Sequence, residues 1–402
     1  MLPRGSLFRA IGIATLAATQ CVAQPAVTCS ANPLYSYSLR MEGLAELMAD
    51  VEFYCYNDGS TTVIVPMDLR LALETNVTSN RDFGQGADFT DAQLIYYPVC
   101  NYWPCPAPPP PVFGRLLADN RTLQWTPVAA IPPSSMGAVR FRIVNVRGKV
   151  FGLGAAPVTL FATATISSPM PLYFPSQRMV LGYAENSLTT SVLASSGTES
   201  FRIQIDERHS FAFKRLGMPR TDFYSYDPNQ EDGYFAPGSG VNNGGATQGT
   251  RLLIELLGVP GGVRVLVPHI VPATGTSSSL EIRRVEGADA NGAGGCIYQL
   301  TCLEPPPAGN LALVPVTRGT GSVVYEVTTP SYWYNIDRVE IPVMVCHGPA
   351  NNTECRSFVN QTALRGLKVR VSLAPVSTVA TSDPAAPEPR FVNVSAPVDV
   401  PQ

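Results

Sequence analysis

Short runs that alternate polar and apolar residues recur along this chain of 402 residues, and they constrain its fold more than any other feature. Residues 50–55, 139–144, 201–205 and 367–371 follow this pattern. A period of two sends successive side chains to opposite faces of a strand, so that one face meets a core and the other meets water. The arginines in these runs, among them Arg142, are therefore expected on the wet face.

The composition supports a fold of many short strands. The 33 glycines and 37 prolines are spread along the chain, as in proteins whose strands are joined by turns. Strands with one solvated face fit antiparallel sandwiches better than α/β layers. The sequence therefore predicts an all-β protein made of tandem antiparallel β-sandwich (Ig-like) modules, with loops clamped locally by disulfides.

The length exceeds that of one ordinary core and predicts several domains. Two stretches rich in Ser, Thr and Gly, residues 187–199 and 274–279, mark the expected boundaries. Three related strand patterns start roughly one Ig-sized domain apart, and they are either three homologous modules or three copies of one hairpin type. The expected organisation is a signal peptide at 1–23 and β-sandwich modules at 24–186, 187–279 and 280–402.

The N-terminal segment has the three parts of a secretory signal. A basic start precedes an apolar run that ends near Ala18 and is too short to span a bilayer about 30 Å thick. The small residues Cys21 and Ala23 place the expected cleavage before Gln24, whereas Gln20 disfavours the alternative of a lipid on Cys21. No later segment has the roughly 18 apolar residues of a membrane span. We therefore expect a secreted protein, extracellular or at the cell surface, with the periplasm as an alternative location.

Eight of the nine cysteines fall into four near-neighbour pairs behind this leader. In an oxidising compartment such pairs predict local disulfides. Zinc is the alternative, because His347 adjoins one pair, but the intervals within the pairs do not match the C-x2–4-C halves of structural zinc sites. Two of the small loops lead into proline-rich segments, which form extended rods at sheet edges or in loops. The expected disulfides are Cys29–Cys55, Cys100–Cys105, Cys296–Cys302 and Cys346–Cys355.

Charge and motifs exclude several classes of function. The net charge is −3 at pH 7 and 15% of residues are charged, so no electrostatic surface for nucleic acid is expected. Only His209, His269 and His347 supply imidazoles, and none lies in an H-E-x-x-H motif. The chain also has no G-x-S-x-G elbow and no G-x-x-x-x-G-K-[ST] phosphate loop. We therefore expect no catalytic residues.

One acidic segment is a candidate calcium loop. Asp227, Asn229 and Glu231 alternate along it, and oxygen ligands at such a spacing suit a hard cation. The segment departs from the EF-hand order, because its glycine, Gly233, stands at the seventh position and Gly238 occupies the twelfth. Calcium is thus the one cofactor that the sequence raises as a candidate.

Aromatic residues on loops are the best candidates for ligand binding. Planar rings on rigid loops can stack on sugars or anchor a protein partner, and the alternative is that they pack their own loops against the ends of sheets. An extracellular glycan or a protein surface is the expected partner. The candidate ligand-binding residues are Tyr102, Trp103, Tyr332, Trp333 and Tyr334.

Three segments carry a resemblance to a known class of proteins. LRMEGLAELMADVEFYC (39–55), VRFRIVNVRG (139–148) and TQGTRLLIELLGVPGGVRVLVP (247–268) resemble secreted bacterial β-rich proteins of unknown function. The likeness is one of pattern over a small part of the chain, and it implies no activity. The expected architecture is also similar to Ig-like surface or adhesion modules, although a fold does not imply a function.

The sequence therefore predicts a secreted, non-enzymatic structural or adhesive protein. A carbohydrate-binding array that uses the aromatic loops is one alternative. A secreted hydrolase with a site assembled from scattered residues is another.

Overall fold

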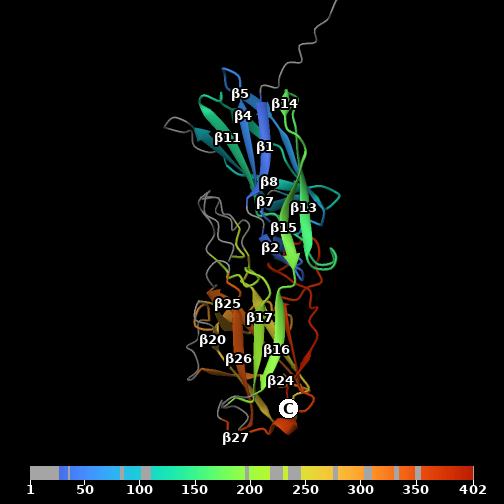
Figure 1. Cartoon of the computed structure of the whole chain (residues 1–402), viewed down its shortest axis with the longest axis vertical. Coiled ribbons are helices and arrows are strands. Elements are labelled where there is room, and N and C mark those ends of the chain that lie inside the picture. The colour runs from blue at the N-terminus through green and yellow to red at the C-terminus, as the bar shows by residue number, and fades with distance from the viewer. Residues whose placement is uncertain are drawn as a thin grey trace, which may run out of the picture.

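The protein is all-β. The computed structural model describes residues 27–34, 37–81, 86–100, 110–194, 199–217, 230–233, 246–274, 279–302, 310–329, 335–348 and 355–401. These residues form strands, turns and one 3-10 helix, η1 (Gln361–Leu364), and they contain no α-helix. The molecule is elongated, with residues 27–185 (the N-terminal half) at one end and residues 188–401 (the C-terminal half) at the other, as Figure 1 shows.

Eleven strands of the N-terminal half form one long sheet, in the order β14-β1-β4-β11-β7-β8-β9-β6-β13-β15-β2. The sheet curls until its two ends meet: β14 pairs in parallel with β1, and the Gln177 side chain in β15 accepts a 2.8 Å hydrogen bond from the Ala31 N–H in β1. The bounds are β1 (Val27–Leu34), β2 (Tyr37–Arg40), β3 (Glu46–Leu47), β4 (Asp50–Asn57), β5 (Val63–Pro66), β6 (Asp68–Leu73), β7 (Phe89–Cys100), β8 (Val112–Leu116), β9 (Thr122–Trp125), β10 (Val128–Ile131), β11 (Gly137–Val144), β12 (Arg147–Gly148), β13 (Val158–Ser167), β14 (Leu172–Tyr173) and β15 (Gln177–Glu185).

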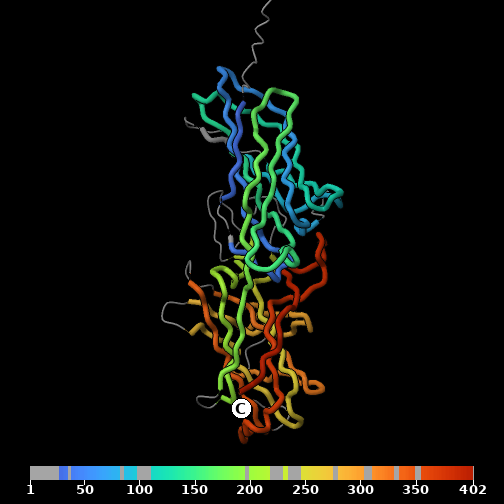
Figure 2. The backbone as a smooth tube through the Cα atoms, turned by 45° about the vertical axis from the view of Figure 1, so that its right-hand side comes forward, coloured from blue at the N-terminus to red at the C-terminus, as the bar shows by residue number. Residues whose placement is uncertain are grey.

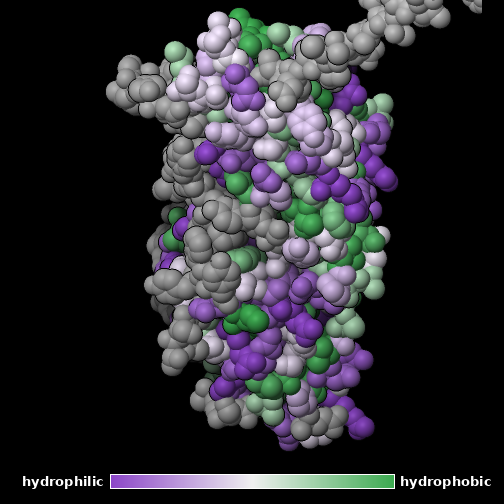
Figure 3. All heavy atoms as spheres, turned by 45° about the horizontal axis from the view of Figure 1, so that its top comes forward, coloured by the Kyte–Doolittle hydropathy of each residue, from purple (hydrophilic) through white to green (hydrophobic). Residues whose placement is uncertain are grey.

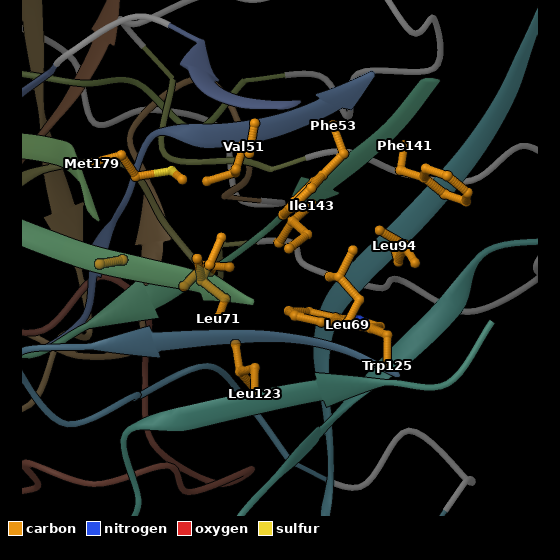
Figure 4. Close-up of a cluster of buried hydrophobic side chains, with 14 of the residues drawn as sticks. Val51, Phe53, Leu69, Leu71, Leu94, Leu123, Trp125, Phe141, Ile143 and Met179 are labelled. Atoms are coloured by element: carbon orange, nitrogen blue, oxygen red, sulfur yellow. The ribbon is translucent and has the colours of Figure 1, made fainter. Parts of the chain in front are cut away.

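The core of this half lies inside the curled sheet. Phe53 of β4 and Phe141 of β11 point toward Leu69 of β6 and Trp125 of β9, as Figure 4 shows. Every second residue of these strands is buried, as a period of two requires. Gly114 in β8 is needed for this packing, because a Cβ there would lie 2.8 Å from the Trp125 ring.

A two-stranded ribbon of β5 and β10 extends from the far end of this half. Its inward residues Val65, Ala129 and Ile131 are buried, whereas the outward pairs Ile64–Ala130 and Pro66–Val128 are exposed. Ile64 and Val128 are 63% and 71% exposed. The ribbon thus presents an apolar outer face next to prolines that limit further strand pairing.

Two sheets enclose the core of the C-terminal half. One has the order β16-β17-β26-β19-β23, with β27 paired to β26; the other has the order β20-β21-β25-β18-β28-β29, with β22 and β24 attached. The bounds are β16 (Leu188–Ala194), β17 (Phe201–Glu207), β18 (Arg251–Leu257), β19 (Arg264–Pro268), β20 (Ile270–Pro272), β21 (Glu281–Glu286), β22 (Cys296–Ile297), β23 (Leu311–Val314), β24 (Val316–Thr317), β25 (Thr320–Thr329), β26 (Arg338–His347), β27 (Ser357–Phe358), β28 (Lys368–Ala374) and β29 (Val398–Asp399).

Strands from both sides of residue 279 share this core. β17 pairs with β26, and β18 lies between β25 and β28. The boundary expected between residues 279 and 280 therefore does not separate two cores, because neither 187–279 nor 280–402 contains a complete sheet. The two large buried clusters of the protein divide between Ala184 and Val192, where β15 leads into β16.

The alternating runs form strands, as expected. They are β4, β11, β17 and β28. The expectation that their arginines face water is wrong for Arg142, whose side chain is 6% exposed. The Arg142 Nη2 atom lies 2.6 Å from Asp50 Oδ2 on the neighbouring strand, so an opposite charge compensates for its burial.

Three of the four expected disulfides are present among the described residues. They are Cys29–Cys55, Cys296–Cys302 and Cys346–Cys355. Cys29 and Cys55 lie directly opposite each other on β1 and β4, so this bond ties two neighbouring strands. The Cys100 side chain and Cys105 lie outside the described residues.

Hydrophobic and hydrophilic residues are interspersed on the face of the molecule that Figure 3 shows, with hydrophobic residues gathered in small groups. None of the helices in the described ranges is long and apolar enough to cross a membrane.

We predict that the two kinds of disulfide contribute unequally to stability. Replacing Cys29 and Cys55 by serine opens a loop with a sequence separation of 26, and it should lower the free energy of unfolding by about 3 kcal/mol. Removing Cys296–Cys302, with a separation of 6, should cost about 2 kcal/mol. Denaturant unfolding of the two double variants tests this, and an equal loss in both would contradict it.

Candidate functional site

A cluster of buried charged side chains lies between the two halves of the molecule. The N-terminal half supplies Arg40, Glu46, Asp91 and Arg147, and the remaining members follow β17 in the chain. All are at most 5% exposed. We call this set the junction cluster: Arg40, Glu46, Asp91, Arg147, Lys214, Glu231, Asp232, Glu388 and Arg390.

The chain segment after residue 375 returns to this junction. The backbone trace in Figure 2 shows it (red) rising beside the C-terminal half to reach the N-terminal half. There it is held by two main-chain hydrogen bonds, from Leu44 N–H to Arg390 O (2.8 Å) and from Val392 N–H to Glu42 O (2.9 Å). The junction therefore contains main-chain pairing as well as ion pairs.

A tight turn after β2 brings Glu46 back to Arg40. The Gly43 N–H donates to Arg40 O at 2.9 Å and closes the turn. Glycine is required at position 43, because a Cβ there would overlap the Glu46 side chain. As a result, Arg40 Nε donates to Glu46 Oε1 at 2.9 Å, and both side chains have no exposed surface.

Arg40 joins the two halves. Its Nη1 and Nη2 atoms donate to the two carboxylate oxygens of Glu231, at 2.5 and 3.0 Å, in a fork-like pairing. Nη1 also donates to Thr250 Oγ1 at 2.8 Å, and the guanidinium lies 4.7 Å from the ring centre of Phe391. Every side of this guanidinium therefore meets an acceptor or an aromatic ring.

A second ion pair lies beside the first. Arg147 Nε is 2.9 Å from Glu388 Oε2, although the two groups are not aligned as a hydrogen bond. Arg147 Nη2 donates to the main-chain oxygen of Glu231 at 2.5 Å, and Nη1 donates to Ala45 O at 3.2 Å. Arg147 thus contacts two separate segments of the C-terminal half, one around Glu231 and one around Glu388.

Attraction between neighbouring opposite charges keeps Arg40 and Glu231 ionised in spite of their burial. Burial alone would lower the pKa of Arg40, but Glu231 and Glu46 outweigh it and raise the pKa. Burial would raise the pKa of Glu231, and the nearby Arg40 and Lys214 hold it below its usual range instead. Burial raises the pKa of Asp232 to about 6. Arg40 and Glu231 are therefore a true ion pair at neutral pH.

The members of this cluster are enclosed, and their charges are compensated mainly by one another. Desolvating ion pairs costs free energy that good geometry offsets only in part, which makes a buried network a better device for fixing an arrangement than for adding stability. The Arg40–Glu231 and Arg147–Glu388 contacts exist only when the two halves hold one relative orientation.

Clefts on the described surface are small. Three of them measure about 140, 220 and 310 Å³. Small-molecule sites are typically ~300–1,000 Å³. The 220 Å³ cleft lies at the β15–β16 connection and is lined by Glu185 and Arg208. Two of these three clefts are smaller than that range, and the third lies at its lower end.

Most residues expected to bind ligands lie outside the described residues. They are Tyr102, Trp103, Tyr332, Trp333 and Tyr334, together with the expected calcium ligands Asp227 and Asn229. Glu231, the third expected calcium ligand, lies in the junction cluster. Its two carboxylate oxygens bind Arg40, so its role there is that of an ion-pair partner. Within the described ranges, no group of three or more His, Cys, Asp or Glu side chains is arranged to hold a metal.

The histidines occupy unrelated positions. His269 is 1% exposed and stacks on Tyr298, with ring centres 3.9 Å apart. His209 is buried close to the junction, where burial lowers its pKa. His347 is exposed at the end of β26.

The sequence did hold a signal for the junction cluster. Arg40 and Glu46 lie in segment 39–55, Arg147 in segment 139–148 and Thr250 in segment 247–268. These three segments carry the resemblance described above, and the structure brings them together. In addition, Glu46 and Arg147 stand among apolar neighbours, where a charge needs a buried partner.

Comparisons with known proteins give no family. No family model matches the chain, and no curated protein matches it. Three solved structures are similar at low scores. A structure described as AvmM, which catalyses macrocyclization in alchivemycin A biosynthesis, is 14% identical, with 41% of this chain and 94% of that chain covered and a TM-score of 0.20.

The B domain of a biofilm-associated protein is 9% identical, with coverage of 92% and 84% and a TM-score of 0.23. A manganese lipoxygenase of Gaeumannomyces graminis, solved with part of zonadhesin of Komagataella pastoris, is 10% identical, with coverage of 91% and 94% and a TM-score of 0.23. Scores of this size carry no argument about fold or function.

We predict that Arg40→Ala is strongly destabilising. It leaves Glu46 and Glu231 buried without their shared partner, so the free energy of unfolding should fall by about 3–5 kcal/mol. The matched control is Arg115→Ala, because the Arg115–Asp88 pair is 55% and 61% exposed and should contribute less than about 1 kcal/mol. Chemical denaturation measures both variants, and similar losses would contradict a special role for the junction.

Glu207, buried next to the junction, should make stability depend on pH. Its carboxylate accepts hydrogen bonds from the N–H groups of Phe213 and Asp337, yet burial raises its pKa from 4.5 to about 8. The folded state therefore binds this proton more tightly than the unfolded state does. Its contribution to stability is complete below pH 4.5 and is lost as the pH rises through about 8.

Glu207→Gln tests this dependence. Because glutamine stays neutral, the free energy of unfolding of wild type should fall relative to that of the variant as the pH rises through that window. Unfolding curves at several pH values measure this difference. A difference that stays constant with pH would show that Glu207 does not titrate there.

Proposed function

We propose that this is an exported, non-enzymatic structural or adhesive protein that works outside the cell as a stiff two-part rod. The observation that carries the proposal is the junction cluster, because its ion pairs Arg40–Glu231 and Arg147–Glu388 cross from one half to the other and have no exposed side-chain surface. A protein that transmits force or holds a binding surface at a distance needs such a fixed connection between its parts.

Three disulfides support the proposal of an extracellular location, because such bonds persist in oxidising compartments. We also propose that a signal peptide at 1–23 directs export. The two facing sheets around one core support an Ig-like sandwich in the C-terminal half, whereas the N-terminal half is one curled sheet.

An extracellular glycan or protein surface is the partner that we propose. The small clefts favour recognition across a surface. Trp103 and Trp333, with the tyrosines beside them, remain the proposed contact residues. They would be carried on a scaffold whose rigidity reduces the entropy lost on binding.

Small-angle X-ray scattering of the mature chain tests the rod. The scattering curve of wild type should fit a single rigid, elongated particle. Arg147→Ala removes the contacts to Glu388 and to Glu231 O, and it should add the signature of flexibility between the two halves. Arg115→Ala should leave the curve unchanged. If wild type scatters as two loosely linked particles, the proposal fails.

Binding is tested separately on arrays of glycans and extracellular proteins. We expect capture by at least one surface, and a loss of at least tenfold in Trp103→Ala or Trp333→Ala, since ring stacking contributes about 1–2 kcal/mol at such contacts. Tyr173→Ala, which removes a ring that is 55% exposed elsewhere, is the control. Turnover of a substrate in a broad hydrolase screen would overturn the non-enzymatic assignment.

A further inference from the structure

One carboxyl group in the junction cluster has no partner. Asp91 lies in β7, where Ala92 and Leu94 point into the core and Asp91 and Gln93 point to the opposite face. Asp91 is fully buried, and neither of its side-chain oxygens has a hydrogen-bond partner among the described residues. Both amide atoms of Gln93, two residues along on the same face, are also buried without a partner.

The basic groups nearest to Asp91 bind other acceptors. Arg147 pairs with Glu388 and donates to two main-chain oxygens. Arg390 donates to the main-chain oxygens of Val379, Pro387, Thr381 and Thr78, and it lies 3.6 Å from Glu388 Oε1. Arg147 and Arg390 therefore bind other acceptors, and among the described residues no ion pair between either of them and Asp91 is formed.

Asn80 faces Asp91 across a main-chain hydrogen bond from Asp91 N–H to Asn80 O (2.9 Å). Its side-chain amide is best oriented with the nitrogen toward Glu388 Oε1 and Asp383 O, each at 3.1 Å. In this orientation Asn80 donates to Glu388 and not to Asp91. The Asn80 amide therefore serves Glu388, whereas Arg147 and the main-chain N–H groups of Asp91 and Asn80 offset the burial of Asp91 only in part.

The charges in the cluster are unequal. Five carboxyl groups (Glu46, Asp91, Glu231, Asp232 and Glu388) are buried with four basic groups (Arg40, Arg147, Lys214 and Arg390). An uncompensated charge in such a site costs several kcal/mol, and a buried acid avoids that cost by keeping its proton. Burial first, and then the charge of Glu388, raise the pKa of Asp91 well above its usual range, while Arg147 opposes them.

We propose that Asp91 is a proton-binding site that couples the connection between the two halves to pH. The protonated carboxyl is neutral and therefore avoids the cost of an unpaired buried charge. Loss of the proton places a second, unpaired negative charge beside Glu388 in an enclosed seam. The closed junction is then favoured in the protonated state and is weakened when Asp91 ionises.

The direction of the effect follows from linkage. Because the pKa is raised in the folded state, the contribution of Asp91 to stability is complete below its unfolded pKa. That contribution is lost as the pH rises through the folded-state pKa. The contribution of Asp91 should therefore favour the closed junction while Asp91 holds its proton and weaken the junction as the pH rises.

Asp91→Asn tests the proposal, because asparagine mimics the neutral acid. The unfolding midpoint of wild type should fall relative to that of the variant as the pH rises, so that the variant is higher by at least about 2 °C at alkaline pH. Asp88→Asn is the matched control, since the Asp88 side chain is 61% exposed, and its difference from wild type should not change with pH. A difference between wild type and Asp91→Asn that is independent of pH would overturn the proposal.

A direct measurement covers the case in which Asp91→Asn folds poorly. Infrared difference spectra of the Glu207→Gln chain, in which the other buried carboxyl with a strongly raised pKa is removed, should show loss of a protonated carboxyl band at a pH well above that of exposed carboxyl groups. Absence of any such band at neutral pH would also overturn the proposal.

The proposal extends the proposed rod function, and the two can fail separately. Scattering at one acidic pH tests whether the halves form a rigid rod at all. The pH dependence of the Asp91→Asn difference tests the proton site. If the protein is a rigid rod and Asp91→Asn changes neither its dimensions nor its stability, the rod proposal stands and the proton-site proposal fails.

Discussion

The fork-like pairing of Arg40 with Glu231 is the contact on which the arrangement of this protein depends. Each half has its own hydrophobic core, so each could fold around its own apolar side chains. Those cores do not determine how the halves lie relative to each other. A guanidinium that must satisfy Glu46 on one side and Glu231 on the other allows one arrangement, because any other leaves buried charge unpaired.

Much of the fold could be predicted from the sequence, because the period-two pattern is a local property. The runs at β4, β11, β17 and β28 form strands, and three of the expected disulfides form. The pairing of β17 with β26 could not be read in this way. Strand partners far apart in sequence are chosen by packing within a shared core, and a stretch rich in Ser and Thr such as 274–279 gives no sign that the strands on its two sides share one core.

The site was harder to predict than the fold. Arg142 looked like a wet-face residue because alternation reports which face a side chain occupies and not whether that face is covered. Glu231 looked like a cation ligand because acidic spacing is the same for a metal loop and for an ion-pair network. Charged residues inside apolar stretches, such as Glu46 and Arg147, indicate buried charges that need partners. The partners across the junction, Glu231 and Glu388, lie in distant segments and could not be predicted.

The return of the chain to the junction has a consequence for biosynthesis. Arg40 is separated from Glu231 by 191 positions, and Thr78 O binds Arg390 over a separation of 312. A chain made from its N-terminus therefore completes most of its first half while Arg40 and Arg147 still lack their acceptors. Pairing over such separations costs loop-closure entropy, and the Arg147–Glu388 ion pair needs the chain to extend at least to residue 388.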